Sequence, residues 1–438
     1  MTRLGIAGLV LILAGCATSR PALVVEKAGG AFEGVFPARD FGAVADGVAD
    51  DTAAIQKAID CACQKGGTVY LPPGRYHVAG SLHVKPGVTL RGANTAPMSI
   101  TPLTGTILLA TGGRDEESAP ALFEMTNAAV VTGLTVFYPD QKVDDIHPYP
   151  WTVHMQGFDT TLENVTFINS YNGIKVGPEP NVRHRIRSVA GCVLRRGLLV
   201  DACTDIGRVE NVQFHCHWWS DAVTGGDFEK VMKYMVANLE AFVFGRTDWE
   251  YTTNNFVFPA KVGWRFIKTD AGMCNGHFTG NGADACETAI QVDAIQPMGL
   301  LFTGGQYVAF TGTNPVELRI SPTCGGNVRF VNCSFWGPAL HNAVLQGKGT
   351  TSFSDCYFSS WMDDSGALVL AEAGRLQINN CTFATPHPVD VELGPNIDYA
   401  LVQGNNGPFG VRVSDSSAGK AIVANNEPEK PLPPKEKK

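Results

Sequence analysis

The sequence lacks several features that would assign it to a common functional class. Beyond its first residues it has no run of about 18 apolar residues, which excludes a membrane-spanning helix from the rest of the chain. It has no basic excess, because 34 lysines and arginines against 42 acidic residues give a net charge of −8, which argues against a nucleic-acid partner. Its twelve cysteines do not show the paired CxxC spacing of zinc sites. We therefore expect neither nucleic acid nor a metal site.

The first residues have the pattern of an export signal. Arg3 precedes an apolar stretch from Leu4 to Leu13, which has the length of a signal-peptide core and is too short to span a bilayer. The following Leu13-Ala14-Gly15-Cys16 resembles the bacterial lipobox, in which cleavage falls before a lipid-carrying cysteine. The resemblance predicts a signal peptide at 1–15, lipidation of Cys16 and a tether at 16–35. Alanine rather than aspartate at position 17 favours the outer membrane, with the lipid as the contact to the membrane.

A short pattern recurs along the chain: asparagine, two residues, then phenylalanine. Strong copies begin at Asn164, Asn211, Asn275, Asn332 and Asn380, and a variant begins at Asp355. Short runs rich in valine, isoleucine and leucine follow after turns, and no helix-length periodic segment separates them. Such repeats indicate a solenoid in which each coil stacks on the next. The sequence therefore predicts an all-β, parallel β-helix domain over residues 36–425, followed by a disordered tail at 426–438.

Stacking of the coils predicts ladders of like residues. Cys333, Cys356 and Cys381 should form one interior ladder, which leaves these thiols buried. The asparagine before each of them should form a second ladder at a turn, because asparagine tolerates the left-handed backbone conformation. We assign these residues to structure and not to chemistry.

A capping helix is predicted at the start of the domain. Asp51-Thr52 begins it, its apolar face runs from Ala54 to Ile59, and Gly66-Gly67 ends it. We expect the acids Asp46, Asp50 and Asp51 to form turns and to cap this helix. Together with Asp40-Phe-Gly-Ala43 and Leu71-Pro72-Pro73-Gly74, the segment resembles the opening of the pectate-lyase-like β-helix superfamily.

This resemblance implies a right-handed parallel β-helix and a polysaccharide or oligosaccharide substrate. It does not name the reaction, because one fold carries many activities. The strings Asn-Thr-Asp, Gly-His-Gly and Arg-Ile-Lys of the polygalacturonase subgroup are absent, so the catalytic residues of that subgroup cannot be transferred. The sugar, the linkage and the oligomeric state stay open.

Two irregular regions interrupt the repeat, and irregular coils are where function concentrates. The first, from Phe137 to Trp151, offers Tyr138, Tyr149 and Trp151 as aromatic faces for sugar rings. The second contains an insertion at about 221–270, with an amphipathic helix from Phe228 to Leu239. The second region and the strand beside it supply further candidate substrate-binding residues: Lys175, His215, His217, Trp218, Trp219, Arg246 and Trp249.

Acids near the second region form a pool for glycoside hydrolysis. Carboxylates one coil apart approach the spacing of retaining glycosidases, about 5–5.5 Å, and wider pairs suit inverting ones. Close acids also repel each other, which raises one pKa and supplies a general acid. The candidate catalytic residues are Asp201, Asp205, Asp221, Asp248 and Glu250. Hydrolysis is the first functional hypothesis.

Two other functions remain as alternatives. A polysaccharide lyase or an epimerase needs a base such as Lys175, with Arg183, Arg185 and Arg187 nearby. We expect no cofactor for a hydrolase, whereas a lyase would use Ca²⁺ on Asp201 or Asp205. The third hypothesis is a non-catalytic glycan-binding surface protein, which would bind sugar without creating reducing ends.

Overall fold

The computed structural model describes residues 33–98, 101–222, 226–362 and 366–433. The predicted signal peptide, Cys16 and nearly all of the predicted tether lie outside these residues. None of the described helices is long and apolar enough to cross a membrane.

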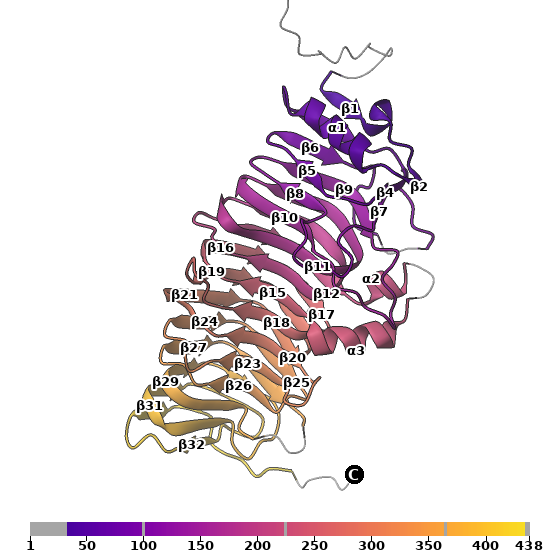
Figure 1. The fold of residues 1–438 in the computed structure, drawn as a ribbon. Coiled ribbons are helices and arrows are strands. Elements are labelled where there is room, and N and C mark those ends of the chain that lie inside the picture. Colours follow the sequence, from indigo (N-terminus) through magenta and orange to yellow (C-terminus); the bar gives the residue numbers. More distant parts are fainter. Residues whose placement is uncertain (1–32, 99–100, 223–225, 363–365, 434–438) are drawn as a thin grey trace, which may run out of the picture. The chain divides into compact units, whose positions relative to one another are not determined.

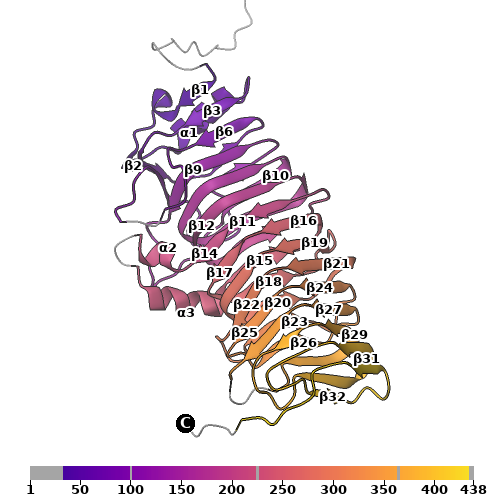
Figure 2. The ribbon, with the colours of Figure 1, turned by 180° about the vertical axis from the view of Figure 1, so that it is seen from behind.

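The chain winds as a right-handed parallel β-helix, which confirms the predicted fold (Figures 1 and 2). Short strands of successive coils lie above one another and form three stacks, here named A, B and C. These strands pair in parallel throughout the part of the chain that the structure describes. Each coil therefore contributes a segment to each face of the tube, and its backbone pairs with the coils before and after it.

Stack A carries the candidate site. It contains β5 (Leu82–Val84), β8 (Phe123–Met125), β10 (Trp151–Phe158), parts of β11 (Thr161–Val182) and β12 (Arg185–Val200), β15 (Glu240–Phe244), β18 (Ala260–Phe266), part of β20 (Gly282–Val292), β23 (Val316–Ile320), β26 (His341–Leu345), parts of β29 (Val369–Asn379) and β31 (Val391–Gln403), and β32 (Val413–Asp415).

Stacks B and C complete the coils. Stack B contains β1 (Val35–Pro37), β3 (Gly67–Tyr70), β6 (Val88–Arg91), part of β9 (Val130–Phe137), β13 (Arg208–Glu210), β16 (Thr247–Thr253), β19 (Cys274–Thr279), β21 (Ile295–Thr303), β24 (Asn327–Val331), β27 (Thr350–Ser354) and β33 (Ala421–Ala424), with segments of β11, β12, β29 and β31. Stack C contains β2 (Asp46–Asp50), β4 (Gly74–Val78), β7 (Thr106–Ala110), β14 (Gln213–His215), β17 (Phe256–Phe258), β22 (Gln306–Ala309), β25 (Ser334–Gly337), β28 (Tyr357–Ser360) and β30 (Thr382–Phe383), with segments of β9, β11, β12 and β20.

The predicted ladders are present. Cys333, Cys356 and Cys381 are all buried, and the backbone N–H of Cys356 donates to Cys381 Sγ at 3.4 Å. The turn residues before them have left-handed backbones, with φ of 53° at Asn332, 56° at Asp355 and 56° at Asn380. The phenylalanines two residues after these cysteines also stack on one another, and the ring centroids of Phe358 and Phe383, for example, are 5.1 Å apart. The repeat is thus a structural device, as the sequence predicted.

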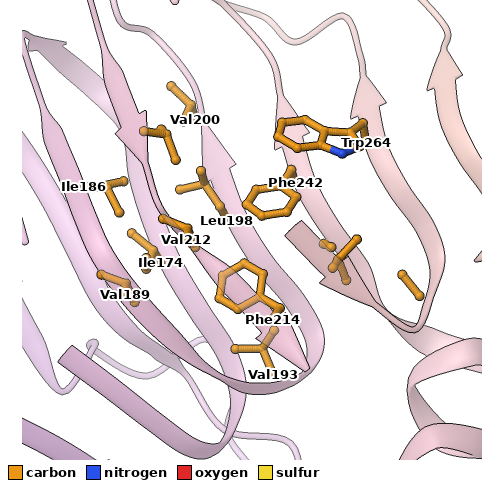
Figure 3. Packing of buried hydrophobic residues seen from close by; sticks show 14 of the residues in the cluster. Ile174, Ile186, Val189, Val193, Leu198, Val200, Val212, Phe214, Phe242 and Trp264 are labelled. Atoms are coloured by element: carbon orange, nitrogen blue, oxygen red, sulfur yellow. The ribbon is translucent and has the colours of Figure 1, made fainter. Parts of the chain in front are cut away.

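The interior is filled by the inward-facing residues of the strands. In stack A, Ile174, Leu198, Phe242 and Trp264 lie in register on consecutive coils, and Figure 3 shows them facing the same interior space. The rings of Phe242 and Trp264 stack with centroids 4.3 Å apart. Because each coil buries its apolar face only against its neighbours and the shared interior, outward-facing positions are free to vary.

The N-terminal coil is covered by α1 (Thr52–Ala62), which follows the short 3-10 helix η1 (Ala38–Phe41). Ile55, Ala58 and Ile59 are buried, so the predicted apolar face is confirmed. The capping chemistry differs from the prediction. Asp51 accepts from the backbone N–H of Val44 at 2.6 Å, whereas the Asp50 carboxylate accepts from the N–H of Thr52 at 3.0 Å.

The insertion is shorter than predicted. It contains α2 (His217–Ser220) and α3 (Phe228–Asn238), and the helix predicted at 228–239 is therefore present. Residues 240–266, which we expected to belong to the insertion, form the regular strands β15 to β18. The Lys230 ammonium of α3 pairs with Asp144 at 2.9 Å, which joins the two irregular regions on the outside of the tube. The start of the predicted tail also has structure, because Glu427 donates its N–H to the Asn405 carbonyl at 2.8 Å.

Candidate active site

A ladder of ionisable side chains runs along the outer face of stack A. Within stack A, β5, β8, β10 and β11 carry four ionisable residues that are paired in register from coil to coil: His83, Glu124, His154 and Lys175. Each lies between two buried apolar residues, as His154 does between Val153 and Met155. Since side chains alternate along a strand, the apolar neighbours point inward and the ionisable residue points outward. Figure 1 shows these strands following one another near the N-terminal end of the tube.

This ladder lies in a groove of about 700 Å³. One wall is the segment from Glu117 to Ala121, and Trp151 and Gln156 of β10 lie beside the ladder. The groove thus offers an aromatic ring, an amide and charged groups, which is the set of side chains that sugar hydroxyls and carboxylates require. The volume is within the range of ordinary ligand sites, about 300–1,000 Å³.

His154 is held from both sides. Its Nδ1 lies 2.9 Å from a Glu124 carboxylate oxygen, and its Nε2 lies 3.0 Å from the Gly177 carbonyl and 3.1 Å from the Glu179 carboxylate. Gln156 Nε2 also lies 3.0 Å from Nδ1. These contacts fix the orientation of the imidazole at the floor of the groove, with each ring nitrogen at hydrogen-bond distance from a glutamate side chain.

Glu124 is held as a carboxylate. Burial raises its pKa, but hydrogen bonds from His154, from the Ala121 N–H at 2.8 Å and from Gln156 Nε2 at 2.8 Å outweigh this, so the pKa is below its usual value. A carboxylate in this state orients a histidine and cannot act as a proton donor near neutral pH.

Lys175 differs from its neighbours in the ladder. It is half-buried and, within the described ranges, makes no hydrogen bond or ion pair. Its nitrogen is thus available to a molecule in the groove. Glu117 on the opposite wall accepts from Asn172 Nδ2 at 3.0 Å, and Asn172 lies on the same strand as Lys175.

The structure brings two of the predicted site residues into this groove, Trp151 and Lys175. It places the predicted acids elsewhere. Asp201 is nearly buried, and one of its oxygens accepts from the N–H of Arg246 at 2.8 Å and from the Thr269 hydroxyl at 2.8 Å. Such a carboxylate organises the backbone of neighbouring coils.

The remaining predicted acids are dispersed. Asp205 pairs with Arg183 at 3.4 Å, and Asp221 is an exposed residue at the end of α2. Asp248 pairs with Arg246 and accepts from Gln296 Nε2 at 2.6 Å. Glu250 is completely buried inside the tube. No ladder of facing carboxylates forms from these described residues, so we do not include them in the proposed site.

Several predicted aromatic residues are structural. Tyr138 and Tyr149 are buried and their rings are 4.7 Å apart, so neither offers a face to a sugar. Trp218 and Trp219 are also buried under the insertion. Trp249, by contrast, is 61% exposed, but it projects from stack B on β16.

The two predicted histidines of the insertion form an aromatic cluster. The His215 ring stacks on Phe258 with centroids 4.6 Å apart and meets His217 edge-on at 4.2 Å. Burial lowers the pKa of His215 to about 4 and also lowers that of His217. Both rings are therefore neutral packing groups near pH 7.

Sequence reasoning missed most of the groove: His83, Glu117, Glu124, His154, Gln156 and Glu179. A signal was available in the triplets Leu82-His83-Val84, Phe123-Glu124-Met125, Val153-His154-Met155 and Ile174-Lys175-Val176, each an ionisable residue between two apolar ones. The spacing between these triplets is irregular, and only the register of the coils aligns them.

Comparisons with known proteins agree with this fold. Residues 35–174 match the family model described as rhamnogalacturonase A/epimerase, pectate lyase-like, and this range ends inside the strand that carries Lys175. The A-module of mannuronan C-5 epimerase AlgE6 from Azotobacter vinelandii has a similar structure, with a TM-score of 0.52, 17% identity, and coverage of 90% of this chain and 100% of that module. The family match is confined to the N-terminal part of this chain, and the structural likeness shows the shared parallel β-helix fold.

Two curated relatives from Azotobacter vinelandii share local similarity. Mannuronan C5-epimerase AlgE3 is 47% identical over 87 residues, which cover 18% of this chain and 5% of that protein. Alginate lyase 7 is 51% identical over 57 residues, which cover 13% of this chain and 7% of that protein. The matched segments are thus small parts of these relatives.

Proposed function

We propose that this protein is a polysaccharide-modifying enzyme that removes the proton next to the carboxylate of a uronic-acid residue, as a C5-epimerase or a lyase. The observation that supports it is Lys175, whose amine makes no hydrogen bond or ion pair among the described residues and lies in a groove beside His154 and an aromatic ring. The names of the local relatives, mannuronan epimerases and an alginate lyase, favour the same substrate class.

The chemistry needs a base and a cation. In its neutral form Lys175 takes the proton from C5, and the electron pair of the broken C–H bond moves into the sugar carboxylate. A protonated His154, one coil away at about 4.8 Å, would stabilise the developing negative charge on that carboxylate. Return of a proton from water to the other face of C5 gives the epimer. Expulsion of the glycosidic oxygen from C4, which takes a proton from water and leaves as a hydroxyl group, gives an unsaturated sugar.

Hydrolysis, the first hypothesis from sequence, has weaker support in this groove. A glycosidase needs a carboxylic acid that keeps its proton near neutral pH. The pKa of Glu124 is lowered, which is the opposite of what that role requires. A purely glycan-binding role would use the ammonium group of Lys175 to hold a sugar carboxylate, and it predicts binding without any product.

Products distinguish the reactions. The purified protein is incubated with polymannuronate, polyguluronate and polygalacturonate, with and without Ca²⁺, while ultraviolet absorbance, reducing ends and NMR sugar composition are followed. We expect either unsaturated products or a changed ratio of epimers. New reducing ends without ultraviolet absorbance would mean hydrolysis, and binding without any product would mean a glycan-binding protein. Either result would overturn the proposal.

The same assay locates the site. Lys175→Met should abolish the reaction, whereas Lys261→Met should not, because Lys261 is an exposed strand lysine several coils away on β18. Equal activity of both variants would place the chemistry elsewhere.

We also propose that the enzyme works at the bacterial outer membrane, held by lipid on Cys16. The support is the lipobox Leu13-Ala14-Gly15-Cys16. Cell fractionation of wild type and Cys16→Ser tests it, and the variant should move from the membrane fraction to the soluble fraction.

A further inference from the structure

Three side chains that commonly bind metals meet inside the tube, away from the groove. His184, Cys203 and Glu250 are completely buried, and one potential ligand atom of each lies within 4.8 Å of the others. Buried histidine and glutamate need partners, since an uncompensated charge in the interior is costly.

The three residues come from consecutive coils. His184 lies between β11 and β12, Cys203 follows β12, and Glu250 belongs to β16. Cys203 is bridged in parallel to Asn181 on the coil before and to Thr247 on the coil after. The backbone bonds of the coils therefore fix the three side chains against one another.

The contacts within the cluster leave one ring nitrogen of His184 without a partner among the described residues. Nε2 of His184 lies 3.1 Å from a Glu250 oxygen, and the other Glu250 oxygen accepts from the Thr247 hydroxyl at 2.7 Å. Nδ1 of His184 has no hydrogen-bond partner among the described residues. A buried polar atom without a partner destabilises the folded protein unless something binds it.

The cluster also excludes any side chain at Gly207. A Cβ there would lie 2.2 Å from His184 Cε1 and 2.3 Å from Glu250 Oε2. The backbone at Gly207 thus approaches His184 and Glu250 closely, and there is no room for a larger residue at this position.

We propose that His184, Cys203 and Glu250 bind a divalent transition-metal ion of the zinc class. A thiolate and a carboxylate carry two negative charges, a neutral imidazole carries none, and a divalent ion makes the buried site neutral overall. Nitrogen, sulfur and oxygen are the donors that zinc prefers. Two ligands of a tetrahedral zinc ion lie roughly 3.3–3.8 Å apart, so ligand atoms that now lie within 4.8 Å must approach one another by about 1.5 Å at most.

The ion would have a structural role. Cys203 and Glu250 lie on either side of the insertion that contains α2 and α3, and His184 lies on the coil of Lys175. A metal ion that joins the three residues would link the coil that carries Lys175 to the coil after the insertion. Without the metal, the chain connects these two coils through the long insertion.

Metal analysis of the full chain tests the proposal. After growth with zinc and exhaustive dialysis, we expect one zinc ion per chain in wild type and in Cys286→Ala, and loss of most of it in Cys203→Ala. Cys286 is a matched control, because it is also completely buried and its thiol also contacts the carbonyl of a nearby aspartate, at 3.6 Å against 3.7 Å for Cys203. Wild type without zinc, or Cys203→Ala with wild-type zinc, would overturn it.

Cobalt supplies a readout that does not depend on zinc content. Protein reloaded with Co²⁺ should show a thiolate-to-cobalt charge-transfer band in the near ultraviolet, and Cys286→Ala should keep this band. If Cys203→Ala fails to fold, the cobalt spectrum of the wild-type protein alone tests the proposal. Absence of the band from folded, cobalt-treated wild type would contradict a thiolate ligand and leave a buried histidine–glutamate ion pair.

Discussion

The two halves of the tube use the same positions of stack A for different purposes. In the N-terminal half, the outward residues at the strand centres are Glu124, His154 and Lys175, whereas those of β26 and β29 are Val344 and Leu370. Charged residues return to this ladder only singly on other coils, as Arg265 on β18, Arg319 on β23 and Glu392 on β31. The backbone pairing is parallel in both halves. The coil therefore fixes where a side chain stands, and the outward residue alone decides whether that place carries chemistry.

The largest effect is expected for a core substitution that lowers the stability of the protein and leaves the activity of the folded protein unchanged. Phe358, in the C-terminal half, is completely buried between Phe335 and Phe383. Phe358→Ala should lower the free energy of unfolding by about 3–5 kcal/mol through loss of packing. Denaturant unfolding measures this loss, and the folded fraction should keep its turnover number. A loss of turnover in fully folded protein would show that the two halves are not separate in function.

A change in the groove should have the reverse effect. His154→Gln removes the imidazole beside Lys175, and we expect activity to fall by about 10²–10⁴-fold with little change in unfolding free energy. Steady-state kinetics and thermal unfolding measure both. Loss of folding together with activity would assign His154 to structure instead.

The Glu124–His154 contact predicts a pH dependence. The pKa of Glu124 is lowered in the folded protein, so the stabilising contact is complete above the ordinary value of 4.5 and is lost as the pH falls through the lowered value. Activity should therefore decline on the acid side, and Glu124→Gln should be less active, by roughly tenfold, at pH 7. An unchanged acid limb in Glu124→Gln would show that another group controls it.

The aromatic ring of the groove should matter for binding more than for chemistry. Trp151→Ala removes a surface on which a sugar ring stacks, worth about 1 kcal/mol, so KM should rise by roughly fivefold to tenfold. Trp249→Ala is the control, because Trp249 is exposed on stack B. Equal effects of the two variants would mean that the polysaccharide uses the other face.

The smallest effect is expected at Asp248. Its contacts with Arg246, Asn275 and Gln296 lie outside the groove, so Asp248→Asn should keep activity within about twofold. Inactivity of this folded variant would return the site to the acids that the sequence suggested.

The sequence predicted the fold more completely than the site, for a physical reason. The coils repeat a local pattern, and the asparagine turns and the Cys333–Cys356–Cys381 ladder can be read from spacing alone. The groove depends on alignment between β5, β8, β10 and β11, whose connecting loops differ in length. Lys175 and Trp151 were found because they stand near irregular regions. His154 was not, since a single histidine in a strand carries no pattern.

The interior cluster was invisible for the same reason. His184, Cys203 and Glu250 have no metal-binding spacing, and the insertion separates the last two. Glu250 was even assigned to catalysis, because sequence does not tell which face of β16 points inward when a bulge shifts the register between Thr247 and Glu250.

The central claim is that Lys175 exchanges a carbon-bound proton of a uronate in the groove. Incubating polymannuronate with the enzyme in D₂O and measuring deuterium at C5 by NMR or mass spectrometry tests it most directly. For wild type and Lys261→Met, we predict deuterium at C5 in epimerised product or C4–C5 unsaturation in cleaved product. For Lys175→Met, we predict neither of these products. Product formed by wild type with C5–H retained would contradict the account.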